Sequence, residues 1–268
     1  MAVQEQLHTI TQPLRDQLAG LAQATSQFAA LWELQAQWSR AVSGTFNGLR
    51  RAVRRGCPPN WLDDDDPLRL TDLLEITESG LPTAWVPRAS VLHKLVAAPA
   101  NTRVKVFADC RVEIIEDCQA VLADVMSPEL ADLVAALNEA LEVAASGKLI
   151  VAQALAASVV DTALRHAFQP ARVVGFYKRV KSEIMARHEN AAIAELRWGL
   201  VHVPVATALE VFDPSKDPVP AKLNRHACAH AVGQVQYTPA NAVIAVALAT
   251  SLVREAHQEI VDAAGPTN

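Results

Sequence analysis

Apolar side chains recur at intervals of three or four residues along almost the whole chain. The series near the N-terminus is Leu7, Ile10, Leu14, Leu18 and Leu21, followed by Phe28, Leu31 and Trp32. This spacing places apolar groups on one face of a helix, whereas the alternating pattern of a half-buried strand is nearly absent. The chain is therefore predicted to be all-α, a multi-helix bundle that begins with a long amphipathic helix continuing past Trp38 towards Val53.

Composition supports a folded chain with a sizeable core. Of the 268 residues, 51% are hydrophobic and 20% are charged, which excludes an intrinsically disordered protein. The longest apolar candidate for a membrane span, residues 242–253, falls short of the roughly 18 residues required, and Arg254 follows it. The polar first twenty residues do not match a signal peptide. We expect a cytoplasmic protein without a membrane partner, whose four cysteines are reduced and form no C-x-x-C motif.

Prolines, glycine and small polar residues delimit the predicted helices. The prolines that bound residues 80–87 predict an extended segment there. Ser127 and Thr238 are expected to cap the helices that follow them, each with proline in the first turn, and Gly147 is expected to end a helix. Helices are predicted over residues 88–98, 102–126, 128–146, 148–168, 171–188 and 190–211, with a last helix starting at Pro239.

A boundary near Pro170 divides the chain in one interpretation. Residues 1–169 would form a helical region of unknown role, and residues 170–268 a second helical region with the chemically richest motif. A single domain is the alternative, and the sequence leaves both open.

That motif is Asn224-Arg225-His226-Ala227-Cys228-Ala229-His230, here called the 224–230 window. In a helix over 224–232, His226 and His230 lie on one face, and Asn224 suits the N-cap. Arginine stays charged in proteins, while histidine titrates near neutrality. The window therefore predicts a site that binds a phosphate and transfers a proton, with Arg225, His226 and His230 as its chemical groups.

Carboxylates often orient catalytic histidines. Asp161, Glu183 and Glu195 lie on helices expected to pack near the window, and the choice among them stays open. A zinc site is not favoured, because the histidine pair lacks the glutamate of H-E-x-x-H and a third ligand. We expect no metal and no cofactor. In the structural alternative, the window ties the proline-rich loop at residues 213–220 to the core.

Charge limits the partners of this chain. A net charge of −5 and a pI near 5.9 exclude a protein that coats nucleic acid through many phosphate contacts. A local RNA contact is compatible with two basic clusters, Arg50 to Arg55 and Arg172 to Lys181. Each cluster by itself is more typical of a solvated helix face.

The window resembles the R-x4-H signature of the HEPN superfamily, and Tyr237 to Ala242 is similar to the segment that leads into an apolar helix in HEPN-like defence proteins. The resemblance implies a HEPN-like four-helix region within residues 170–268. It further implies a homodimeric, metal-independent endoribonuclease that leaves cyclic phosphate ends and acts as a toxin, in phage defence or in superinfection exclusion. Arg225 and His230 would be catalytic, and His226 auxiliary.

Four elements also resemble an uncharacterised group of actinobacterial and actinophage proteins. They are P-P-N-W at Pro58 to Trp61, W-V-P-R at Trp85 to Arg88, the Asp117-Cys118 pair, and Arg225 to His230. This resemblance implies one architecture rather than two unrelated domains.

Two functional hypotheses follow. In the first, the protein is an endoribonuclease or toxin that binds RNA locally at the window. In the second, it is a non-enzymatic helical interaction or immunity protein whose window contacts a second copy, or a phage or host protein.

Overall fold

The computed structural model describes residues 57–62, 68–168, 175–188 and 193–264, and every regular element in these ranges is helical. This confirms the all-α prediction, while the predicted N-terminal helix lies outside the described residues. The helices are α3 (Leu70–Glu78), α4 (Ala89–Ala97), α5 (Arg103–Asp109), α6 (Arg111–Ala123), α7 (Ala131–Ala145), α8 (Leu149–Phe168), α9 (Phe176–His188), α10 (Ile193–Ala208), α11 (Arg225–His230) and α12 (Pro239–Ala264), with short 3-10 turns at Pro59–Trp61, Ala100–Thr102 and Pro128–Leu130.

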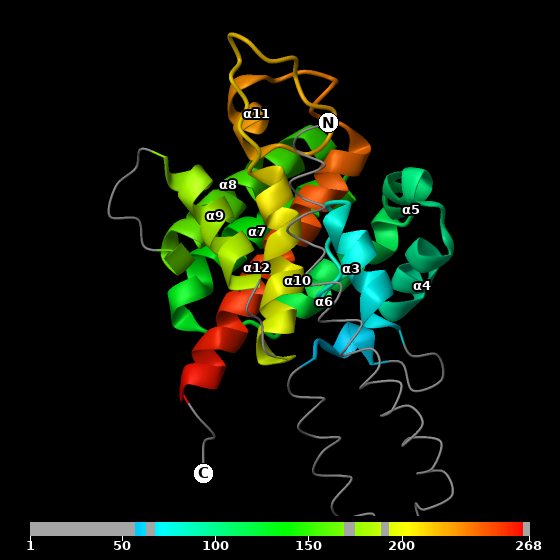
Figure 1. Cartoon of the computed structure of the whole chain (residues 1–268), viewed down its shortest axis with the longest axis vertical. Helices are drawn as coiled ribbons and strands as arrows, with labels where there is room; N and C mark the ends of the chain where they lie inside the picture. The colour runs from blue at the N-terminus through cyan, green and yellow to red at the C-terminus, as the bar shows by residue number, and fades with distance from the viewer. Residues whose placement is uncertain (1–56, 63–67, 169–174, 189–192, 265–268) are drawn as a thin grey trace, which may run out of the picture.

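Helix α12 is the centre of the bundle. Every residue from 241 to 253 is buried, as expected for a helix that is apolar on all sides. It packs against α5, α6, α7, α8 and α10, and Figure 1 shows it crossing the middle of the molecule with α3–α5 on one side and α9 on the other. One hydrophobic core therefore joins described residues from both sides of position 170.

Two of the predicted helix ends are confirmed. The Thr238 hydroxyl accepts a hydrogen bond from the Asn241 N–H at 3.1 Å and caps α12. Gly147 adopts a left-handed φ of 82° after α7, where the Lys148 N–H returns to the Val143 carbonyl at 3.0 Å, the bonding of a glycine-terminated helix. Ser127 does not cap, because its hydroxyl bonds the Nδ1 atom of His257 on α12 at 2.7 Å instead.

Several predicted boundaries are corrected. The helix expected over 102–126 is two helices, because the backbone turns at Cys110 (ψ 19°) and both pieces then pack on α12. Helix α10 stops at Ala208, before the expected residue 211, and α9 starts at Phe176, after Gly175 with its φ of 73°.

Residues 81–87 are buried and non-helical, but they are not extended throughout, because Trp85 has a φ of 69°. Two indoles fix this part of the molecule, as loop-anchoring tryptophans do. Trp61 donates to the Thr83 carbonyl at 2.8 Å, and Trp85 donates to the carboxylate of Glu255 at 2.9 Å.

The four cysteines are free thiols. In the described ranges, none of the helices combines the length and the apolar composition needed to span a bilayer.

Candidate functional site

Asn224 starts α11 as predicted. Its side-chain oxygen accepts from the Ala227 N–H at 2.8 Å, and its amide nitrogen donates to the Glu210 carbonyl at 2.9 Å. The helix is shorter than the expected 224–232, because Ala231 leaves helical geometry with φ −137° and ψ 67°. Asn224 is buried, so its role is to position the window rather than to contact a ligand.

Two buried glutamines join the loop before the window to the core. Gln236 accepts from the Asn224 N–H at 3.1 Å and donates to the carbonyls of Pro220 and Lys222 at 2.9 and 3.0 Å. Gln153 on α8 donates to the Gln236 carbonyl at 3.0 Å. The window therefore does tie the proline-rich loop to the core. Sequence reasoning missed both glutamines, although Gln153 is a polar residue inside an apolar helical run.

The two histidines form an edge-to-face pair. Their ring centroids are 4.7 Å apart, and the ring of His226 also meets the Phe212 ring edge-on at 6.3 Å. His230 is exposed and His226 is partly buried. Burial lowers the pKa of His226 below its usual value, and the neighbouring His230 and Arg225 charges lower it further. A neutral imidazole at pH 7 can accept a proton, so His226 has the form that a general base requires.

Arg225 is held by Asp161 and Tyr177. Its Nη2 atom lies 2.9 Å from Oδ2 of Asp161, and its guanidinium carbon lies 5.0 Å from the centre of the Tyr177 ring. The other Asp161 oxygen accepts the Tyr177 hydroxyl, and Arg165 donates to Asp161 at 3.2 Å. Asp161 thus reaches the window as predicted, but it orients the arginine rather than a histidine.

Arg225 and His226 share a pocket of about 190 Å³ with Tyr177 and Lys178 of α9. Lys178 is exposed, and Lys181, one turn further along α9, lies 3.9 Å from Glu210. The fold therefore brings part of the second basic cluster beside the window. Arg172 and the whole first cluster lie outside the described residues.

The remaining candidates do not reach the histidines. Glu183 is exposed on α9. Glu195 belongs to the first turn of α10, and its side chain is outside what the structure describes. Cys228 is buried on the opposite side of α11 from the histidine pair, and burial raises the pKa of its thiol. No group of three or more His, Cys, Asp or Glu side chains could hold a metal ion within the described ranges.

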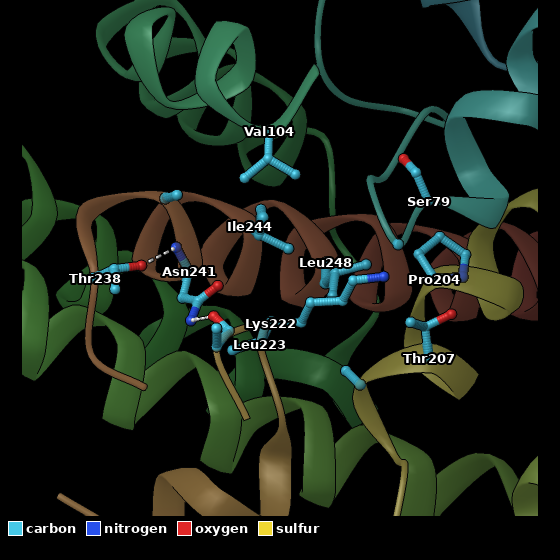
Figure 2. Close-up of a pocket in the computed structure, with 14 residues that line it drawn as sticks. Ser79, Val104, Pro204, Thr207, Lys222, Leu223, Thr238, Asn241, Ile244 and Leu248 are labelled. Carbon is cyan, nitrogen blue, oxygen red and sulfur yellow. Dashed lines mark hydrogen bonds between the residues drawn. The ribbon is translucent and has the colours of Figure 1, made fainter. Parts of the chain in front are cut away.

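A larger pocket, of about 290 Å³, lies beside residues 221–223 and between α5, α10 and α12. Figure 2 shows Ile244, Leu248 and Val104 around it and the Lys222 side chain lying across it. Asn241 donates to the Ala221 carbonyl at 2.9 Å, which secures this edge. Its lining is mainly apolar and lacks the acid–base groups of the window, so the window remains the candidate catalytic site.

Comparison of the chain with protein-family models, with curated proteins and with solved structures finds no match.

Proposed function

We propose that the 224–230 window binds an RNA phosphodiester and cleaves it without a metal ion. The observation that carries the proposal is the contact between the partly buried His226 and the exposed His230, beside a pocket that His226, Arg225 and Lys178 line. Two imidazoles and a fixed guanidinium are the groups required to move a proton and to stabilise charge on a phosphate.

The proposed reaction is transesterification. The neutral His226 imidazole accepts the proton of a ribose 2′-hydroxyl, and the 2′-oxygen attacks the adjacent phosphorus. The bond from phosphorus to the 5′-oxygen breaks, and His230 acts as the general acid that gives a proton to that oxygen. The products are a 2′,3′-cyclic phosphate and a free 5′-hydroxyl, so protons and bonds balance without an additional reactant.

Arg225 would bind the non-bridging phosphate oxygens. A guanidinium has five N–H donors, and the ion pair with Asp161 is made through Nη2. The ion pair therefore holds the arginine in place while leaving donors for a phosphate. Lys178, exposed on the same pocket, would contact a neighbouring phosphate and keep RNA binding local.

His230→Ala tests this proposal. Loss of a general acid costs about 10²–10⁴-fold in rate, so the variant should lose nearly all cleavage of total RNA by the purified protein. Wild-type activity should persist in a chelator and leave cyclic phosphate ends. His166→Ala is the matched control, because His166 is an exposed histidine on α8. Cleavage by His230→Ala at the wild-type rate would refute the proposal.

A second candidate is a non-enzymatic protein contact, made through dimerisation at the same end of the molecule. Three valines near the window are strongly exposed: Val211 at 80%, Val232 at 79% and Val235 at 52%. Large exposed apolar side chains are candidates for a protein interface. Here Val232→Asp would convert a dimer into a monomer in light scattering, and RNA would remain intact with every variant.

A further inference from the structure

Three sequence elements that the proposed reaction does not use converge on one pocket. Asn60 comes from the P-P-N-W element, Trp85 and Arg88 from W-V-P-R, and Asp117 from the Asp-Cys pair; all four line a pocket of about 400 Å³. Its other walls are the start of α4, the exposed face of α6 and Arg254 of α12. Residues far apart in the sequence thus build one concave surface, of the size that small ligands occupy.

The walls of this pocket are fixed by hydrogen bonds. Asn60 donates to the carbonyls of Thr83 and Pro87 at 2.9 and 2.7 Å. Asp117 accepts from Nε of Arg88 at 2.6 Å and from its backbone N–H at 2.8 Å. The Arg88 and Asp117 charges therefore compensate each other, and neither is the free charge of the pocket.

Arg254, unlike Arg88, forms no ion pair with a described carboxylate in this pocket. Its guanidinium lies 4.0 Å from the centre of the Trp85 ring, and Nη1 donates to the amide oxygen of Gln258 at 3.1 Å. In the described part of the chain, no carboxylate lies within ion-pair distance of it. Burial lowers the pKa of Arg254, and the more distant Asp124 and Glu255 carboxylates only partly offset this. An anionic ligand would stabilise such a cation strongly, because it supplies the counter-charge that the partly desolvated guanidinium lacks.

We propose that this pocket binds a small carboxylate whose apolar part is an aromatic or short aliphatic group. The carboxylate would contact Arg254, and the apolar part would lie against Ala89, Ala120 and Val121, which line the same pocket.

The pocket favours one negative charge over two. Asp124 also lines it, and the charge of this carboxylate opposes a dianion, such as the hydrogen phosphate ion, more strongly than a monoanion. The Trp85 ring holds the Arg254 guanidinium by a cation–π contact, and its indole is itself fixed by the bond to Glu255. The site is separate in position and chemistry from the 224–230 window, so the two proposals stand or fall independently.

Benzoate, its neutral isostere benzamide and inorganic phosphate are the probes for this site. We expect saturable benzoate binding to the full-length protein with a dissociation constant of about 1 mM, typical of a ligand with few heavy atoms, and a shift of the Trp85 indole N–H signal in two-dimensional NMR spectra. Benzamide should bind at least about tenfold more weakly, because it cannot form the charge-assisted bond to Arg254. Phosphate should bind at least about tenfold more weakly because it has no apolar part for Ala89, Ala120 and Val121 and because the Asp124 carboxylate repels its second charge.

Arg254→Met keeps the aliphatic stem over Trp85 and removes the charge. It should weaken benzoate binding at least about tenfold, while Arg111→Met, which removes an exposed arginine on α6, should leave it unchanged. If Arg254→Met fails to fold, Ala120→Trp takes its place as the test variant, because the larger side chain fills the pocket from the exposed face of α6 and should abolish benzoate binding.

The proposal is overturned if the wild-type protein shows no saturable benzoate binding, or if it binds benzamide as tightly as benzoate. It is also overturned if phosphate binds more tightly than benzoate, or if the folded test variant binds benzoate with unchanged affinity.

Discussion

We expect loss of the buried ion pair between Arg197 and Glu255 to lower the free energy of unfolding strongly. The Arg197 Nε atom lies 2.9 and 3.0 Å from the two Glu255 oxygens, and the side chains are only 8% and 1% exposed. Arg197→Met removes one partner and leaves a carboxylate in the core with the Trp85 indole as its remaining donor. Breaking a buried pair in this way costs about 3–5 kcal/mol, a large fraction of the about 5–15 kcal/mol that stabilises a typical domain.

The assay is urea unfolding followed by circular dichroism at 222 nm. The double variant Arg197→Met/Glu255→Gln should recover part of the loss, because the amide still accepts from Trp85 but carries no charge. Arg69→Met is the control: the Arg69–Asp72 pair is largely solvated, with the arginine 77% exposed, so its loss should change the stability little. A loss below about 1 kcal/mol for Arg197→Met, or a double variant less stable than the single one, would show that an uncompensated buried charge is not the cause.

Two further predictions concern the window and the pH dependence of stability. Asn224→Ala should cost about 1–3 kcal/mol in urea unfolding, because it removes the α11 cap and the bond to the Glu210 carbonyl; Asn138→Ala, at an exposed position of α7, should have little effect, and equal losses would contradict the capping role. Burial lowers the pKa values of His226 and His257, so the folded state binds fewer protons than the unfolded state at mildly acidic pH, and stability should fall as the pH drops below about 6.5. The variant His226→Gln/His257→Gln should show a flatter urea midpoint between pH 7.5 and 5, and an unchanged slope would contradict this assignment.

Helix positions could be predicted from the sequence where local chemistry decides them. Thr238 with Pro239, Gly147 and Asn224 each act through their own backbone neighbourhood, and each does what its residue type predicts. The break at Cys110 could not be predicted, because its cause is the packing of α5 and α6 on a helix more than a hundred residues away. The prediction that Ser127 caps a helix was wrong for the same reason, because its hydroxyl forms a hydrogen bond with His257 of that distant helix.

The candidate site also contains features that local sequence predicts and features that only the packing of distant helices creates. The shared face of His226 and His230 follows from helical spacing and is confirmed by their ring contact. Asp161 could be named as a nearby carboxylate, but its partner could not, because Tyr177 and Arg225 reach it only through the packing of α9 and α11 against α8. Trp85, Arg88 and Asp117 were visible as separate elements. Nothing local indicated that they line one pocket.

Arg225 is less buried than Arg197, so its replacement can test the function of the window without unfolding the protein. Arg225 and Asp161 are 21% and 16% exposed, and Asp161 keeps Arg165 and Tyr177 as donors when Arg225 is removed. No uncompensated buried charge remains, so the cost to folding is far below that of losing Arg197. An Arg225→Ala protein that folds but no longer cleaves RNA has therefore lost a phosphate contact. One that folds but no longer self-associates has lost a protein contact. Because we expect Arg225→Ala to change the stability little, these two outcomes separate the enzymatic hypothesis from the interaction hypothesis.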